Sequence, residues 1–246
     1  MERRVSVSTS KEPARIAGMF DAIAWRYDRL NHLLSAGLDK RWRRRAVREL
    51  RLTKSDRVID VCSGTADLAI ESAGREQGPQ AVVGVDFSGA MLSIGLEKIR
   101  RAGLASRVSL ARGDAMALPF ADASFDAGTI AFGIRNVADP VAGCRELCRV
   151  LRPGGRLAIL EFGMPETPVL AALYAWYFRH VLPRIGRLIS RHSDAYEYLP
   201  ASVAAFPSGT AFVRILQQSG FRDVRCVRLA VGAVYLYLAV CGTQDA

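Results

Sequence analysis

The chain has 246 residues, of which 50% are hydrophobic and 24% are charged, so it can bury one large core and is not expected to be disordered. Its five cysteines and three histidines lack the spacing of a disulfide framework or a metal site, which favours packing thiols in a reducing compartment. The net charge of +10 requires either an anionic partner or a well-solvated basic face.

The N-terminal part of the chain is basic. Residues 1–14 are polar and predict a flexible terminus. They also lack the apolar core of a secretory signal. Residues 15–50 predict a helical cap before the sheet, and the segment DKRWRRRAVRELR at 39–51 concentrates positive charge around Trp42. This segment is either a solvated helix face or a patch that contacts anionic lipid. We expect no nucleic-acid partner, because no recognition motif accompanies the charge.

Apolar segments of strand length alternate with helical patterns from Arg57 onward. Seven segments are predicted to be strands, at 57–62, 81–86, 107–110, 125–131, 156–162, 222–229 and 233–241. Most of the first five are continuously apolar and are separated by helices, which predicts βαβ units and a parallel sheet. The last two follow a predicted helix at 208–219 and lie too close together for a crossover helix. They therefore predict an antiparallel hairpin at the sheet edge.

This order predicts an α/β fold of the Rossmann-like type, a mostly parallel seven-stranded sheet with helices on both faces, formed by residues 15–246 as a single domain. Residues 165–205 are expected to be a helical, aromatic-rich insertion over a substrate site. No apolar run reaches the roughly 20 residues of a spanning helix. We therefore expect a cytoplasmic protein, with association to the inner face of a membrane and a homo-oligomer both left open.

The loop CSGTA at 62–66 consists of small residues that let the backbone approach a ligand. It lacks the lysine of a P-loop, which excludes that phosphate site. The segment GTADLA at 64–69 is a degraded dinucleotide fingerprint with Asp86 about 20 residues further on, so a NAD-dependent oxidoreductase stays open as an alternative. Two glycine positions of that fingerprint carry alanine, which disfavours a pyrophosphate. A ligand with adenosine but no pyrophosphate, S-adenosylmethionine, fits better.

Acidic residues follow the first three strands at the edge where ligands bind in such sheets. Asp86 is predicted to accept hydrogen bonds from both ribose hydroxyls, and Asp114 from the adenine amino group. Asp60 is predicted to hold the ammonium group of the methionine tail, directly or through water, while Gly64 and Thr65 present backbone to that tail. Each acid alone could instead cap a helix or close a turn. Three at successive strand ends predict a cofactor site.

At these residues the chain resembles the ubiquinone/menaquinone biosynthesis C-methyltransferases, which are class I S-adenosylmethionine-dependent enzymes. The resemblance rests on MFDAIAWRYDRLNHLLSAGLDKRWRR (19–44), GDAMALPFADASFDAGTIAFGIRNV (113–137), LRPGGRLAILEF (151–162) and DAYEYLPASVAAFPSG (194–209). It implies cofactor contacts at Thr65, Asp86, Asp114 and Ala115. Ala131 stands where the family often has a serine, and the loop CSGTAD is poorer in glycine than the family pattern.

The resemblance implies a polyprenylated hydroquinone as acceptor, methylated on a ring carbon. That carbon is a weak nucleophile until the adjacent hydroxyl loses its proton, so the enzyme must favour the phenolate and accept the ring proton. Arg135 is predicted to stabilise the developing oxyanion or to orient a water that takes the proton, and Asn136 to orient the same oxygen. A surface salt bridge is the alternative role for Arg135.

Four further residues are predicted to contact the substrate. Tyr27 and Asn31, one helical turn apart, would close the pocket from the N-terminal helix, and Tyr196 and Tyr198 would line the ring pocket. Ordinary helix or core packing is the alternative for all four. No metal is expected, because the sulfonium is already activated. A methyltransferase-like binding protein without activity stays open beside the oxidoreductase.

Overall fold

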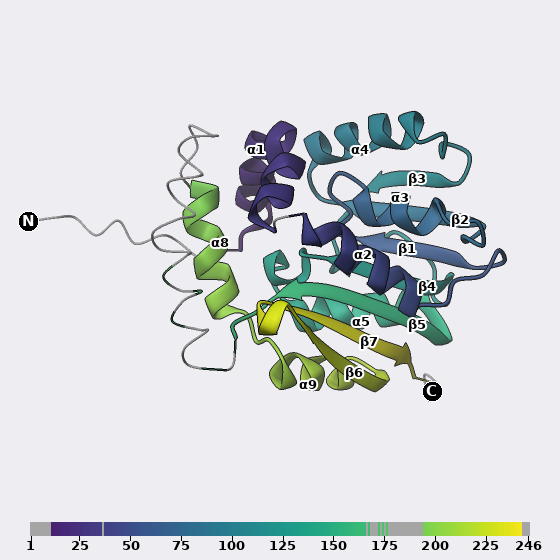
Figure 1. Ribbon diagram of the computed structural model, residues 1–246. Coiled ribbons are helices and arrows are strands. Elements are labelled where there is room, and N and C mark those ends of the chain that lie inside the picture. Colours follow the sequence, from purple (N-terminus) through teal and green to yellow (C-terminus); the bar gives the residue numbers. More distant parts are fainter. Residues whose placement is uncertain are drawn as a thin grey trace, which may run out of the picture.

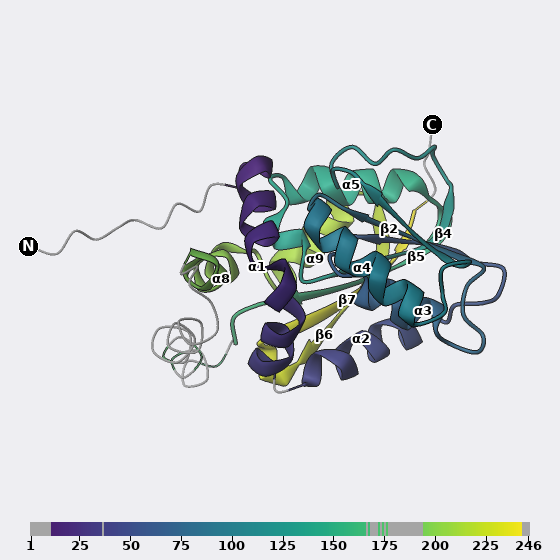
Figure 2. The ribbon, with the colours of Figure 1, turned by 90° about the horizontal axis from the view of Figure 1, so that it is seen from above.

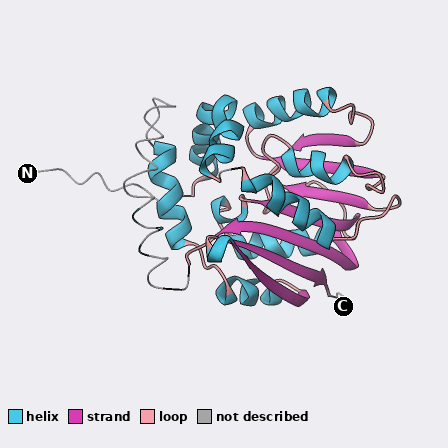
Figure 3. Ribbon diagram, in the orientation of Figure 1, coloured by secondary structure: helices cyan, strands magenta, loops and turns pink. Residues whose placement is uncertain are grey.

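The computed structural model describes residues 11–35, 37–165, 167, 172, 174, 176 and 194–242. These residues form a seven-stranded sheet with helices on both sides (Figures 1 and 3). The strands are β1 Arg57–Val61, β2 Ala81–Asp86, β3 Val108–Arg112, β4 Phe125–Ala131, β5 Leu151–Phe162, β6 Phe221–Leu229 and β7 Val234–Cys241. The sheet order is β3-β2-β1-β4-β5-β7-β6, and β7 runs antiparallel to both β5 and β6. The predicted fold class and the C-terminal edge hairpin are confirmed.

Helices cover both faces of the sheet, as Figure 2 shows from above. The helices are α1 Pro13–Leu34, α2 Leu38–Glu49, α3 Asp67–Ala73, α4 Gly89–Arg101, α5 Pro140–Val150, α8 Asp194–Ala205 and α9 Thr210–Gln218. Side chains of α5 and α9 pack with one face of the central strands, and those of α2, α3 and α4 pack with the other. Because both faces are covered, β1 and β4 are almost entirely buried, as their continuous apolar sequences predict.

The start of β5 differs from the prediction. The strand begins at Leu151 rather than at position 156, because Phe125 pairs with Leu151 and Ala127 already pairs with Arg156. The residues between Leu151 and Arg156 therefore bulge out of the register. Gly154 adopts a φ of 79°, which glycine reaches without strain. A proline and two glycines concealed this first half of the strand from a pattern based on apolar runs.

The helical cap is present as two helices, α1 and α2. α1 lies beside α8 and α4, on the side of the sheet toward which the parallel strands run (Figure 1). α1 is fastened to the sheet by Asp21, which accepts a hydrogen bond from the Ser88 hydroxyl, while Ser88 itself caps α4 by accepting from Met91 N–H. α1 thus covers the carboxyl ends of the strands, whereas α2 packs on one face of the sheet.

The predicted insertion at 165–205 lies only partly within the described residues. α8 falls inside it and is helical as expected, but most positions from 166 to 193 and the side chain of Tyr196 lie outside the described residues. In the part of the chain that is described, no single helix has both the length and the apolar character to cross a membrane, although the bent pair Tyr198–Ala205 and Thr210–Gln218, at 71°, meets those criteria jointly.

Candidate active site at the carboxyl ends of the strands

A cavity of about 790 Å³, its opening to solvent included, lies at the carboxyl ends of β1 to β4. α1 contributes the apolar side chains Ile16 and Phe20 together with Tyr27. The predicted residues that line it from the strand ends and their loops are Gly64, Asp86, Asp114, Ala115 and Asn136. Sequence positions far apart thus meet at one edge of the sheet, as expected for parallel strands.

Asp86, the last residue of β2, is tied to the loop after β1. Its Oδ2 accepts a hydrogen bond from Gly64 N–H at 2.8 Å, and its Oδ1 accepts one from Ser88 N–H at 2.8 Å. Burial raises the pKa of Asp86, and these backbone amides oppose the rise. A carboxylate can accept about four hydrogen bonds, so Asp86 retains the capacity for the ribose hydroxyls that the sequence assigns to it.

The loop after β1 holds three residues in the left-handed region, Cys62 and Gly64 at φ 55° and Ala66 at φ 65°. At Gly64 a Cβ would meet no atom within 4 Å, so there is open space beside the backbone of this residue. Cys62 and Ala66 each carry a strain of about 1–2 kcal/mol in this conformation. Ala66 is fully buried, so its side chain packs in the core where a glycine would leave space.

Asp114 and Ala115 form the turn after β3. Asp114 Oδ1 accepts a hydrogen bond from Met116 N–H at 2.9 Å, and Asp114 forms a backbone bridge with Ala117. Asp114 is therefore a turn residue and a cavity residue at once, so the two roles that the sequence left open are compatible. At Gly113 a Cβ would lie 3.0 Å from Val85 Cγ1, a close contact to which Val85 would have to adjust by a few tenths of an ångström.

A second, smaller cavity borders the same loop and shares Tyr27, Cys62 and Gly64 with the first. Asp60 lines it and is only 1% exposed. The carboxylate accepts hydrogen bonds from Ser63 Oγ at 2.9 Å and Thr129 Oγ1 at 2.7 Å. Burial raises the pKa of Asp60 to about 6, against the lowering effect of these two hydrogen bonds.

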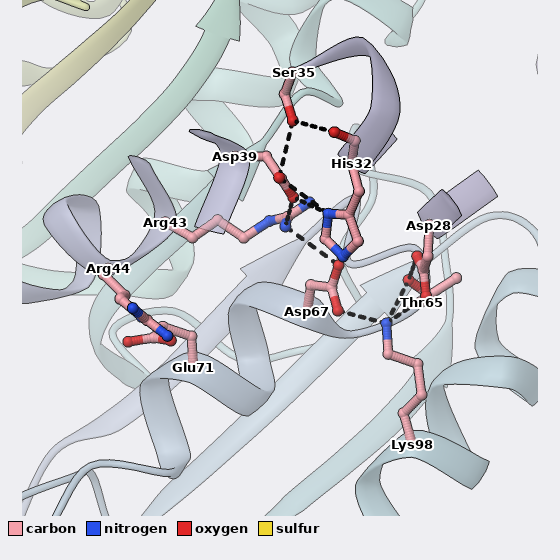
Figure 4. Close-up of polar contacts among 10 residues, drawn as sticks. All are labelled: Asp28, His32, Ser35, Asp39, Arg43, Arg44, Thr65, Asp67, Glu71 and Lys98. Carbon is pink, nitrogen blue, oxygen red and sulfur yellow. Dashed lines mark hydrogen bonds and ion pairs between the residues drawn. The ribbon is translucent and has the colours of Figure 1, made fainter. Parts of the chain in front are cut away.

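Thr65 also lines the smaller cavity, but its hydroxyl is used for structure (Figure 4). It donates to Asp28 Oδ1 of α1 at 2.6 Å and accepts from Lys98 Nζ of α4 at 3.0 Å. Lys98 in turn forms an ion pair with Asp28 Oδ2 at 2.7 Å and a shorter one with Asp67. Thr65 therefore joins the loop after β1 to two helices through its hydroxyl, and its predicted backbone contact with a ligand stays a prediction.

Arg135 and Asn136 lie in a short 3-10 turn after β4 but differ in environment. Arg135 is 5% exposed, and its Nη1 forms an ion pair with Glu161 at 2.9 Å. Its backbone N–H donates to the other carboxylate oxygen of Glu161 at 3.1 Å. Asn136 lines the large cavity, and its Oδ1 is buried without a partner among the described residues. The salt bridge considered for Arg135 exists, but it is buried rather than on the surface.

Tyr27 and Tyr198 also differ in environment. Tyr27 lines both cavities, and burial raises its pKa while the Asn31 side chain lowers it by hydrogen bonding. Asn31 thus contacts Tyr27, and Tyr27 lines the cavities. Tyr198 is 3% exposed, its hydroxyl has no partner among the described residues, and burial raises its pKa.

Sequence reasoning missed several cavity residues. Ile16 and Phe20 of α1, and Lys11 just before it, line the large cavity, and Arg43 of α2 lines the small one. Burial lowers the pKa of Lys11, and the charge of Arg135 lowers it further. The spacing of Ile16, Phe20 and Tyr27 on one helix face was the signal that could have found the apolar wall.

Residues 8–241 match the family model described as the ubiE/COQ5 methyltransferase family. The chain belongs to this family. A Geobacter sp. (strain M21) protein named ubiquinone/menaquinone biosynthesis C-methyltransferase UbiE is 46% identical over 93% of this chain and 97% of its own. A Bacteroides fragilis demethylmenaquinone methyltransferase is 41% identical, with 93% of each chain covered.

Solved structures support the fold of this ubiE/COQ5 family member. A Thermotoga maritima S-adenosylmethionine-dependent methyltransferase superposes with a TM-score of 0.64 at 20% identity, covering 92% of this chain and 99% of its own. The protein is thus a methyltransferase that uses S-adenosylmethionine. The NAD-dependent oxidoreductase and the inactive binding protein gain no support from these matches.

The residues present fit this cofactor. Asp86 and Asp114 supply hydrogen-bond acceptors at the ends of neighbouring strands, and the half-buried Gly64 lines both cavities. These would hold the adenosine part, with Ala115 beside the ring and Asp60 at the amino-acid end. Ala131 lines both cavities with a methyl group where the family often has a hydroxyl.

Proposed function

We propose that this enzyme methylates a ring carbon of a polyprenylated hydroquinone, either demethylmenaquinol or the equivalent benzoquinol. The observation that carries the proposal is membership of the ubiE/COQ5 family over residues 8–241, with relatives named for this C-methylation. The apolar side chains of Ile16, Phe20 and Phe132 beside the acidic residues of the cavity also favour a flat aromatic acceptor.

S-adenosylmethionine, when bound, supplies an electrophilic methyl group on its sulfonium. The acceptor carbon reaches sufficient nucleophilicity when its neighbouring hydroxyl is deprotonated. Asn136 is the residue that we assign to this hydroxyl, because it lines the cavity and its Oδ1 is buried without a partner among the described residues. An unpaired buried hydrogen-bond acceptor costs about 1–3 kcal/mol. The neutral hydroxyl of the substrate relieves that cost by donating to Oδ1, which orients the hydroxyl before it loses its proton.

We retain Arg135 as the source of positive charge that favours the phenolate. Its guanidinium lies outside the cavity wall but donates to the carbonyl oxygen of Phe132, and Phe132 and Asn136 both line the cavity. The pKa of an arginine stays above about 12, so the group remains charged and is not the base. It therefore acts by its electrostatic potential and by positioning the turn that carries Asn136. A loss of kcat of roughly 100-fold at unchanged cofactor affinity is the expected signature of its removal.

We also propose that the acceptor is met at an anionic membrane surface. The exposed basic residues of α2 are Lys40, Arg41, Arg44 and Arg48. On α1, Trp25 is 65% exposed, and the guanidinium of Arg26 lies 3.8 Å from its ring centroid. Two residues that the sequence placed in this patch are turned inward, since Trp42 packs edge-on against Phe132 at 6.3 Å and Arg43 is buried. A cytoplasmic location and a homo-oligomer stay predictions.

The test uses a short-chain demethylmenaquinol and the matching benzoquinol, each carrying deuterium at the ring position to be methylated. The purified protein with S-adenosylmethionine is expected to give a product that gains one methyl group and loses the deuterium, measured by mass spectrometry. Retention of the deuterium would indicate methylation on oxygen and would contradict the proposal. Failure with both quinols, under conditions in which the cofactor binds, would contradict the substrate class.

A further inference from the structure

Lys11 lies just before α1 and lines the large cavity opposite no protein partner of its own. Within the part of the chain that the structure describes, its side chain forms neither a hydrogen bond nor an ion pair. Asn136, to which we assign the acceptor hydroxyl, lines the same cavity together with Val137 and Ala138 of the turn after β4. The Lys11 amine is therefore available to a ligand that contacts Asn136.

The charged groups that act on Lys11 come from three elements packed around it. They are Arg135 in the turn after β4, Glu161 of β5 and Asp139, the N-cap of α5. Burial lowers the pKa of Lys11 and the charge of Arg135 lowers it further, whereas Glu161 and Asp139 oppose the fall. The net effect favours the neutral amine, which is the form with a lone pair that can accept a proton.

The other titratable residues of the large cavity have other roles. Asp86 and Asp114 accept hydrogen bonds from backbone N–H groups and are assigned to the cofactor. Burial raises the pKa of Tyr27 and of Cys62, so both side chains keep their protons near neutral pH. Among the described residues that line this cavity, Lys11 is thus the side chain that remains to take a proton.

We propose that Lys11 is the catalytic base, whose Nζ accepts the hydroxyl proton of the quinol that is methylated. Rotation about the C–O bond of the quinol turns this proton from Asn136 Oδ1 to Lys11 Nζ. The O–H bond breaks as the N–H bond forms, which leaves an ammonium group beside a phenolate. The inference rests on the proposed function, because the proton belongs to the acceptor of that reaction.

Lys11 returns to its neutral form within one turnover. The ring carbon forms a bond to the methyl group while the C–S bond of the sulfonium breaks and leaves its electron pair on sulfur. The C–H bond at that carbon then breaks, its proton passes to water, and the aromatic phenolate is restored. The Lys11 ammonium group gives its proton back to the phenolate oxygen, so the net product is one proton in solvent.

Three lysine variants test the proposal with a soluble short-chain quinol and saturating S-adenosylmethionine. Lys11→Gln is expected to lower kcat by about 100- to 10,000-fold, with unchanged affinity for S-adenosylmethionine in isothermal titration. Lys11→Arg keeps the charge, but its pKa above about 12 prevents it from acting as a base, so its activity should be as low. Lys54→Gln is the matched control, because Lys54 is exposed and precedes the amino end of β1, at the opposite edge of the sheet.

The acidity of the quinol provides a second measurement. A halogen-substituted quinol that is already ionised at the pH of the assay does not need a base for its hydroxyl. The loss of kcat in Lys11→Gln should therefore shrink to about tenfold or less with this acceptor. The variant protein thus serves as its own control for folding and for cofactor binding.

An activity of Lys11→Gln within about threefold of the wild type would overturn the proposal. Wild-type activity of Lys11→Arg would also overturn it, because a positive charge would then suffice. An equal loss with the ionised and the neutral quinol would show that Lys11 binds the acceptor without taking its proton, which contradicts the proposal as well. Failure of the wild type to methylate any quinol would instead contradict the proposed function.

Discussion

Two buried arginines near the cavities differ in their contacts. Arg43 and Arg135 are 7% and 5% exposed, and each has a carboxylate oxygen within 3 Å, at 2.6 Å and 2.9 Å. Arg43 belongs to a network in which each acid has a second partner, and it lines a cavity. Arg135 is paired with Glu161, which is fully buried, and stands behind the cavity wall.

The comparison shows that burial of a charge does not by itself reveal its role. A guanidinium within a network of several acids and cations can share its donors, so it is available to a ligand. A guanidinium that is ion-paired with one fully buried acid is held by the cost of leaving that acid without its cation. Arg43 can therefore contact a ligand in the small cavity that it lines, whereas we assign Arg135 to electrostatic potential and to positioning of the turn. The same comparison predicts unequal consequences when each arginine is removed.

The largest expected effect is on stability. Arg135→Met leaves the carboxylate of Glu161 buried without its cation and should lower the free energy of unfolding by about 3–5 kcal/mol. Arg43→Gln should cost about 1–2 kcal/mol, because its acids retain other partners. Denaturant unfolding measures both. Adding Glu161→Gln to Arg135→Met should restore part of the loss, and equal losses for the two single variants would contradict the distinction.

The second effect concerns cofactor affinity at the large cavity, which Asp86 lines. Asp86→Ala removes the acceptor predicted for the ribose and also leaves Gly64 N–H and Ser88 N–H without theirs. Binding of S-adenosylmethionine should weaken by about 2–4 kcal/mol, measured by isothermal titration. Glu97→Ala, on the exposed side of α4, is the control and should bind normally. Unchanged affinity in Asp86→Ala, or tighter binding of NAD than of S-adenosylmethionine, would count against the site.

The third effect is a pH dependence set by Asp60. Its pKa is raised to about 6 in the folded protein from 3.8, so the native state binds the proton more tightly than the unfolded state. The free energy of unfolding of the ligand-free protein should therefore fall by about 2–3 kcal/mol relative to Asp60→Asn as the pH rises from about 4 to about 6.

Cofactor binding should show the opposite slope, because the ammonium group requires the ionised carboxylate. Affinity should rise as the pH rises toward about 6, by up to about tenfold per pH unit, and Asp60→Asn should abolish the slope. Isothermal titration at several pH values measures this change. A slope that persists in Asp60→Asn would show that another group is responsible.

The smallest effect belongs to the outer face of α2. Replacing Arg41 and Arg44 by glutamine should weaken binding to anionic vesicles by about 1 kcal/mol for each charge, as measured by co-sedimentation. Added salt should also weaken this binding, because it screens the charges. Activity on a long-chain quinol in vesicles should fall while a soluble analogue is spared. Arg100→Gln with Arg101→Gln is the charge-matched control. Equal losses on both substrates would indicate that the arginines support the fold instead.

The sequence by itself determined the sheet and the position, at the strand ends, of the residues that we assign to the cofactor. Continuous apolar segments and the helices between them are local patterns, and parallel strands must end at one edge, so Asp60, Asp86 and Asp114 were found correctly at strand ends. The prediction failed in detail where Pro153 and its following glycines interrupt the apolar pattern of β5.

The tertiary structure decided which charges meet. The sequence shows that Asp39 and Arg43 share a helix face, because they are four residues apart, but not that this face turns inward toward Asp67 and Asp60. Likewise, Glu161 lies 26 residues from Arg135 and meets it only because β4 and β5 are neighbours in the sheet. Helical repeat and strand length depend on adjacent residues, whereas the burial of an ion pair depends on the packing of elements that are distant in the chain.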